Sequence, residues 1–266
     1  MNPRLPTDHV FLSAQWRSLV MLNWQIDPEL VAPLVPLGTE IDFHDDKTYV
    51  SIVGFMFLDT CVLGMPIPFH RNFEELNLRF YVRRLEEPPI RSDSAPTIKR
   101  GVAFVSELVP RWAIAAVARR GYNEQYDAVP MRHSIVRDAN DGSIDNDGSI
   151  GNDGSIDVEY QWKYQGRWNS IAARGSGRAS PLVADSHEQF IAEHYWGYSQ
   201  QRDGSTFEYQ VKHVPWNVWQ AASFRFDCDV MAQYGDGFAE TLSRTPDSAF
   251  IADGSAVTVS RPRRIN

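Results

Sequence analysis

The sequence predicts an α+β fold that consists mainly of antiparallel β-sheet. Segments rich in β-branched and aromatic residues recur along most of the chain, as strands require. One of them, residues 75–83, alternates between apolar and polar side chains. Helical signals are confined to two short segments, so strands outnumber helices. A chain of 266 residues can bury a large core, and we expect one domain over residues 1–266.

The strand signals are strongest in the first half of the chain. Residues 48–57 (TYVSIVGFMF) predict a buried strand, and residues 102–109 predict a partner for the alternating segment 75–83. In that segment one face carries Leu76, Leu78, Phe80 and Val82, and the other carries Glu75, Asn77, Arg79, Tyr81 and Arg83. Further strands are expected at residues 156–164, 167–174, 206–214, 221–231 and 255–261.

Two helices are expected. The first begins at Pro110, which the first turn of a helix tolerates, and ends at Gly121, a suitable C-cap. The second covers residues 185–196, where Ser186 and Gln189 have the spacing of a capping box.

Residues 138–157 (DANDGSIDNDGSIGNDGSID) contain DGSI three times at a period of six. Recurrent Asp and Asn near Gly suggest a calcium loop, but the segment lacks the EF-hand order that ends in Glu at position twelve. We therefore expect a solvated, low-complexity loop inserted between two strands of a hairpin.

Charge and composition limit the partners. The net charge of −8 and the pI near 5.4 argue against nucleic acid and anionic membrane as main partners. No apolar run approaches 18 residues, and the N-terminus lacks the order of a signal peptide. Cys61 and Cys228 do not form a disulfide framework. We expect a cytoplasmic protein that binds a small molecule, and both a monomer and a homo-oligomer remain open.

Residues 66–133 concentrate charged and amide side chains between apolar segments. These side chains are Arg71, Glu74, Glu75, Asn77, Arg79, Glu107, Arg111, Asn123, Glu124, Arg132 and His133. Polar groups among aromatics must be paired, and fixed polar groups in an apolar cavity are typical of a small-molecule site.

Glu75, Asn77 and Arg79 share one face of their predicted strand. If this face points into a closed sheet, the three side chains form a binding or acid–base cluster. The alternatives are an internal salt bridge and a solvent-facing polar stripe.

Almost the whole chain resembles the DUF2071 (YqjF-like) family, which belongs with the acetoacetate decarboxylase-like superfamily. The matching segments are NW at 23–24, LVPLGTEID at 34–42, VGFMF at 53–57, VLGMPIPFHRNFEELNLRFYVRR at 62–84, YNEQY at 122–126, EHYWGY at 193–198, VPWNVW at 214–219, YGDGFA at 234–239 and SAFIADGS at 248–255. The resemblance implies a β-cone or barrel with a few flanking helices around an internal pocket.

Acetoacetate decarboxylase uses a desolvated lysine that forms a Schiff base with a ketone. By resemblance, Tyr122 matches a tyrosine of the decarboxylase motif, and Glu124 stands where the decarboxylase has its lysine; Glu75 matches a glutamate that positions the substrate. A carboxylate cannot form an imine, so we expect no Schiff base. Glu124 is either a general acid or base, or a salt-bridge partner of Arg119, Arg120 or Arg132.

No metal or cofactor is expected. His187 and His194 are predicted to share one helix face, but with His70, His133 and His213 they match no metal motif. The tryptophan-rich segments around Trp196 and Trp216 are either core or pocket wall.

Two functions remain open. The first is a lyase or hydrolase for a small carbonyl or carboxylate compound, with Glu124 and Glu75 as catalytic residues. Its ligand would be held by Arg79, Asn77, Tyr122 and Arg71. The second is a non-catalytic small-molecule-binding protein.

Overall fold

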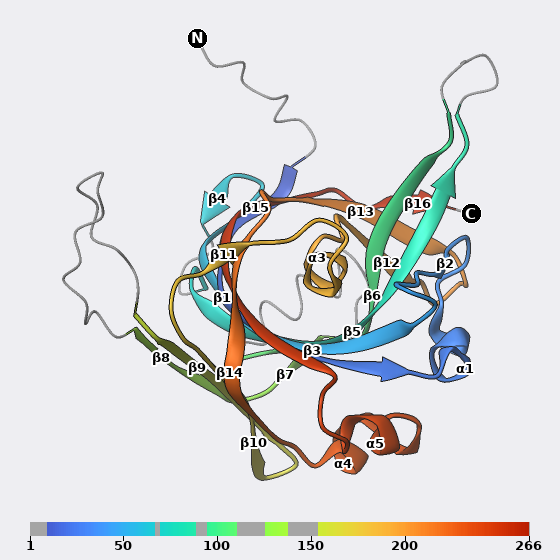
Figure 1. Cartoon of the computed structure of the whole chain (residues 1–266). Helices are drawn as coiled ribbons and strands as arrows, with labels where there is room; N and C mark the ends of the chain where they lie inside the picture. The colour runs from blue at the N-terminus through green and yellow to red at the C-terminus, as the bar shows by residue number, and fades with distance from the viewer. Residues whose placement is uncertain (1–9, 67–69, 89–94, 111–125, 138–153, 266) are drawn as a thin grey trace.

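The computed structural model describes residues 10–66, 70–88, 95–110, 126–137 and 154–265, and strands dominate these ranges (Figure 1). The longer strands are β1 (Val10–Ile26), β3 (Thr48–Val62), β5 (Phe73–Glu86), β6 (Thr97–Val109), β8 (Met131–Arg137), β9 (Ile156–Tyr164), β10 (Arg167–Gly175), β12 (Trp196–Gln200), β13 (Thr206–Lys212), β14 (Asn217–Asp227) and β15 (Ser248–Ser260). Short strands are β2 (Glu40–Ile41), β4 (Met65–Pro66), β7 (Tyr126–Ala128), β11 (Ser180–Pro181) and β16 (Arg263–Ile265).

The helices are short. They are α1 (Pro28–Val31), the 3₁₀ turn η2 (Ala32–Leu34), α3 (His187–Ala192), α4 (Val230–Tyr234) and α5 (Asp236–Leu242). In the ranges given above, none of the helices combines the length and the apolar character that crossing a membrane requires.

The strands form one 16-stranded sheet that closes on itself. Its central strands follow the order β13, β12, β6, β5, β3, β1 and β15, and β13 pairs again with β15. This last pairing, Val211 with Val259 and Lys212 with Thr258, completes a ring of strands. Figure 1 shows α3 within the opening of this ring. Strands β14, β10, β9 and β8 continue from β15 beyond the ring.

The two faces of the ring have separate cores. Leu76, Leu78 and Phe80 of β5 pack on the outer side with Tyr160 and Trp162 of β9, so the continuing strands cover this face. A second cluster lies on the inner side, with Phe55 and Phe73 from the ring and Phe190 and Ile191 from α3. The strands β3 and β5 are therefore covered on both faces.

Most of the predicted strands are confirmed. The segments 48–57, 75–83, 102–109, 156–164 and 167–174 lie in β3, β5, β6, β9 and β10, and β15 begins earlier than its predicted start at 255. The strand predicted at 206–214 is β13, which ends earlier, at Lys212. The prediction of strand up to residue 231 was wrong. The strand β14 ends at Asp227 because the Asp229 side chain accepts a hydrogen bond from Ala232 N and caps α4.

The second predicted helix exists but is shorter than expected. Ser186 Oγ accepts from Gln189 N at 3.1 Å, as a capping box requires, while Gln189 Oε1 accepts from Asp185 N at 2.7 Å. The helix α3 ends at Ala192, because residues from Trp196 pair with β13 as β12. The expectation that His187 and His194 share a helix face was therefore wrong. The helix expected between Pro110 and Gly121 lies outside the described residues.

The repeat falls between β8 and β9, which pair antiparallel from Arg137–Ile156 to Met131–Trp162. Residues 138–153 lie outside the described ranges. The flanking strands are nevertheless adjacent and antiparallel, as the hairpin interpretation requires.

Candidate functional site

The inner side of the ring encloses a cavity of about 120 Å³, which has room for several water molecules or a small organic compound. Its wall is largely aromatic, with contributions from Phe11, Trp16, Phe55, Phe57, Phe73 and Phe104. Trp16 meets Phe55 and Phe57 edge to face, at centroid distances of 5.2 and 5.7 Å. Much of the wall is thus apolar.

The strand β5 places three polar side chains in this wall. Glu75, Asn77 and Arg79 all line the cavity, because they lie on the inner face, opposite Leu76 and Leu78. Glu75 and Asn77 are buried, with exposed fractions of 4% and 2%. The alternation in the sequence predicted this shared face. Because Glu75 and Asn77 are buried, they do not belong to a solvent-facing polar stripe, which was one of the alternatives.

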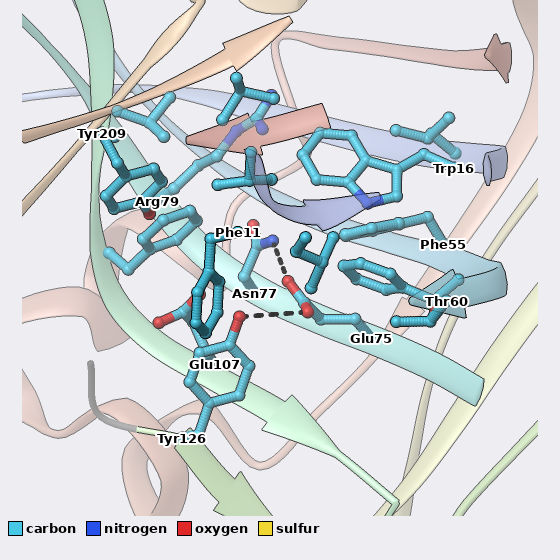
Figure 2. A pocket seen from close by; sticks show the side chains of 18 of the residues that line it. Phe11, Trp16, Phe55, Thr60, Glu75, Asn77, Arg79, Glu107, Tyr126 and Tyr209 are labelled. Atoms are coloured by element: carbon cyan, nitrogen blue, oxygen red, sulfur yellow. Dashed lines mark hydrogen bonds between the residues drawn. The ribbon is translucent and has the colours of Figure 1, made fainter. Parts of the chain in front are cut away.

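Neighbouring strands add a second carboxyl group and a phenol. Glu107 of β6 is paired with Asn77, and Tyr126 of β7 is paired with Glu107, so strand pairing brings the three residues together. Both Glu107 and Tyr126 line the cavity. Figure 2 shows them close to Glu75 and Asn77. The sequence marked Glu107 only as one of the polar side chains of residues 66–133, and neither Glu107 nor Tyr126 was predicted as a site residue; the signal for Glu107 is a charged residue within the apolar segment 102–109.

The Glu75 carboxylate is held by two donors. Tyr126 donates from its hydroxyl to Glu75 Oε2 at 3.2 Å, and Asn77 donates from Nδ2 to Glu75 Oε1 at 3.2 Å (Figure 2). This orientation leaves Asn77 Oδ1 buried, and it finds no hydrogen-bond partner within the described ranges. An unpaired buried acceptor is costly, which makes this oxygen a natural contact for a ligand donor.

Among the described residues, Arg79 has one hydrogen-bond partner. Its Nη2 donates to Ile191 O at 3.2 Å, and its Cζ lies 5.7 Å from the centre of the Tyr81 ring. Its Nε is buried without a partner among the described residues, and none of their carboxylates forms a salt bridge with it. The internal salt bridge considered from the sequence is therefore not formed by Arg79 within these residues, and the guanidinium keeps donor capacity.

His194 adds a polar side chain to the cavity wall, and the sequence did not predict its place there. Its Nε2 lies 3.0 Å from Asp42 Oδ2, and the same oxygen accepts from Arg100 Nε at 2.7 Å. Burial opposes the negative charge of Asp42, but the hydrogen bonds from His194 and Arg100 outweigh it and lower the pKa of the Asp42 carboxyl. Burial also lowers the pKa of His194 to about 4, so the imidazole is neutral near pH 7.

The remaining predicted site residues lie elsewhere. Arg71 is exposed and forms a salt bridge with Asp59 at 2.7 Å, and it is not part of the cavity wall. Tyr122 and Glu124 lie outside the described residues. Trp196 lines the cavity, whereas Trp216 is buried and donates to Ser255 Oγ at 3.0 Å.

None of Lys47, Lys99, Lys163 and Lys212 lines the cavity. Lys99 is buried, but its Nζ lies 2.6 Å from Glu86 Oε2 and 3.1 Å from Glu208 Oε1, and 4.1 Å from the centre of the Trp196 ring. Two carboxylates and an aromatic face therefore surround its ammonium group. Across the residues that the structure describes, no three His, Cys, Asp or Glu side chains gather as metal ligands would.

Solved structures with the same fold include acetoacetate decarboxylases and related enzymes. Acetoacetate decarboxylase from Legionella pneumophila matches with a TM-score of 0.59 at 12% identity, over 100% of this chain and 92% of that chain. The enduracididine biosynthesis enzyme MppR, complexed with pyruvate, matches with a TM-score of 0.58 at 13% identity, over 100% and 92%. An acetoacetate decarboxylase-like enzyme from Sphingomonas wittichii RW1 matches with a TM-score of 0.57 at 10% identity, over 100% and 97%. At these identities the likeness establishes the fold, which is acetoacetate decarboxylase-like.

Among proteins of known sequence, the uncharacterized protein YqjF of Bacillus subtilis is 30% identical over 90 residues, which are 34% of this chain and 37% of that protein. The model of DUF2071, described as an uncharacterized conserved protein, matches residues 13–256. Because this match covers most of the 266 residues, the chain belongs to the DUF2071 family.

Proposed function

We propose that this protein is an enzyme, a lyase or hydrolase, that binds a small carboxylate- or carbonyl-containing compound in the cavity inside the ring. The observation that carries the proposal is that β5 places Glu75, Asn77 and Arg79 in an otherwise aromatic wall. We call these three side chains, a carboxylate, an amide and a guanidinium, the polar strip. Sites for small molecules have this composition, with few convergent polar groups in an apolar enclosure.

The groups of the strip have separate roles. The Arg79 guanidinium, with its free Nε, holds the carboxylate or polarised carbonyl of the ligand. Asn77 Oδ1 accepts from a ligand donor. Glu75, oriented by Tyr126 and Asn77, is the general acid or base, and Glu124 is the second candidate because it stands where decarboxylases have their lysine.

The related structures support a small carboxylate as the ligand class. The enzyme MppR, which shares this fold, is complexed with pyruvate in one solved structure. The proposed reaction does not use a Schiff base, since Lys99 is engaged by Glu86 and Glu208 and the other lysines lie away from the cavity wall.

The alternative is a non-catalytic binding protein. Both oxygens of Glu75 already accept hydrogen bonds from protein groups, which suits a fixed structural carboxylate as well as an acid–base group. Binding and turnover therefore have to be measured separately.

The binding test compares wild type, Arg79→Lys and Arg79→Ala by calorimetric titration and thermal shift with isobutyrate and pyruvate. Wild type is expected to bind and to melt at a higher temperature with ligand. Loss of a charged hydrogen bond should weaken binding by roughly 10- to 100-fold in Arg79→Ala, while Arg79→Lys keeps part of the affinity. If neither acid binds wild type, the proposed site is wrong.

The catalytic test follows a panel of 2- and 3-keto acids and their esters by ¹H NMR. Glu75→Gln is expected to bind the ligand and lose turnover. Binding without any turnover in wild type would favour the binding protein. Borohydride reduction with acetoacetate, followed by mass spectrometry, should leave every lysine unmodified, and an adduct on any of them would restore a Schiff-base mechanism.

A further inference from the structure

His194 adds another buried polar atom to the cavity wall that contains Arg79. His194 is part of the cavity wall, and its side chain is only 1% exposed. It packs against Tyr81 and Phe190 at centroid distances of 4.8 and 5.0 Å. Its Nδ1 is buried and has no hydrogen-bond partner among the described residues. An unpaired buried polar atom on a side chain that lines the cavity is a candidate partner for a ligand there.

The neighbours of His194 determine which kind of partner Nδ1 can take. Asp42 is ionised next to Arg100 and can only accept, so the hydrogen of the neutral imidazole resides on Nε2. Nδ1 then carries a lone pair and is an acceptor. Burial, helped by the positive charges of Arg100 and Arg79, lowers the pKa of His194 and keeps Nδ1 in this state.

Arg79 and His194 are brought to the same part of the wall by Tyr81 and α3. Arg79 donates to the carbonyl of Ile191, three residues before His194, and both side chains contact the Tyr81 ring. The wall therefore pairs a donor that suits a carboxylate with an acceptor that suits a hydroxyl.

We propose that His194 Nδ1 accepts a hydrogen bond from a hydroxyl of the ligand whose carboxylate Arg79 holds. The cavity then selects small hydroxy acids, or the enol forms of keto acids, over carboxylates that lack a hydroxyl. This inference rests on the carboxylate site proposed above. Asp42 is the positioning residue, because it fixes the tautomer without contacting the ligand.

Two matched, achiral pairs of acids test the inference on the full chain by calorimetric titration at pH 7. One pair is 2-hydroxyisobutyrate and isobutyrate, and the other is 3-hydroxypivalate and pivalate, which place the hydroxyl on C2 or C3. For at least one pair, wild type is expected to bind the hydroxy acid roughly two- to tenfold more tightly, the gain of one hydrogen bond. His194→Gln keeps a donor for Asp42 and lacks the Nδ1 acceptor, so this advantage should disappear while the affinity for the plain acid stays.

A measurement on wild type alone covers the case in which the variant does not fold. In long-range ¹H–¹⁵N spectra, the Nδ1 resonance of His194 should shift with the preferred hydroxy acid and not with its matched acid. Equal affinities within both pairs, or an advantage that survives in His194→Gln, would overturn the role of His194 alone. If none of the acids binds, the carboxylate site itself fails, and the two failures are thereby distinguished.

Discussion

Ser51 donates a hydrogen bond from its hydroxyl to Asn23 Oδ1, with 2.6 Å between the oxygens, and both residues are fully buried. Because the Ser51 hydrogen is used, the Tyr81 hydroxyl must donate to Ser51 Oγ, also at 2.6 Å. Asn23 Nδ2 donates to Ser248 Oγ at 2.9 Å, and that hydroxyl lies 2.8 Å from His187 Nε2. A directional chain of hydrogen bonds thus crosses the fold from Tyr81 to His187.

This chain makes Ser51→Ala destabilising. The substitution leaves Asn23 Oδ1 and the Tyr81 hydroxyl without their partner, and we expect a loss of about 1–3 kcal/mol in the free energy of unfolding. Thr48→Val is the matched control on the same strand, because Thr48 Oγ1 is buried without a partner within the described residues. Urea melts should show no loss for Thr48→Val, and equal losses for both variants would contradict the chain.

Acidification should destabilise the protein through His194. Its pKa is about 4 in the folded chain and 6.5 in the unfolded chain, so between these values the unfolded state binds the additional proton. Stability is full above pH 6.5 and falls by about 3 kcal/mol towards pH 4. Burial also lowers the pKa values of His187 and His213, which act in the same direction.

Urea melts at several pH values between 7 and 4 test this dependence. His194→Gln removes one titrating group, and its stability should fall less steeply than that of wild type. Parallel profiles for the two proteins would show that His194 is not buried as a neutral ring.

Gly197→Ala should disturb the cavity. Gly197 is paired with Tyr209 across β12 and β13, both residues line the cavity, and a Cβ at position 197 would overlap the Tyr209 ring. We expect a loss of about 1–3 kcal/mol in stability, together with weaker ligand binding. The control is Gly237→Ala in α5, where no atom lies within 4 Å and alanine suits the helix. Two variants of equal stability would show that the ring can move away freely.

Replacing residues 138–155 with Asn-Gly should preserve the fold. Arg137 and Ile156 are directly paired, and two residues suffice to join antiparallel neighbours. A shorter loop should leave the free energy of unfolding unchanged or raise it by up to about 2 kcal/mol. Thermal melts of wild type with calcium and with EDTA provide the control, because a calcium-dependent melting temperature would support a calcium loop.

The strands that alternate without interruption were predictable, and the first strand was not. The strand β1 spans Val10–Ile26, but its register shifts between Arg17 and Val20, and Ser18 has a φ of 54°. Such an irregularity breaks the period of two, so the segment shows no continuous alternation.

The same division applies to the candidate site. Glu75, Asn77 and Arg79 follow one another on one strand, so alternation alone places them on one face. Asp42 and His194 are 152 positions apart, and only the completed ring brings them to 3.0 Å. The local sequence pattern therefore predicts that the β5 residues lie together, but it cannot predict the contact between Asp42 and His194.

The two-sided burial of β5 limits which changes this strand tolerates. Its odd-numbered inner residues form the floor of the cavity, while Leu76 and Leu78 anchor the outer strands. Inserting or deleting one residue here would exchange the faces, sending charges into the outer core and leucines into the cavity. The lining of the cavity can therefore change by substitution at single inner positions, with the length of this segment held constant.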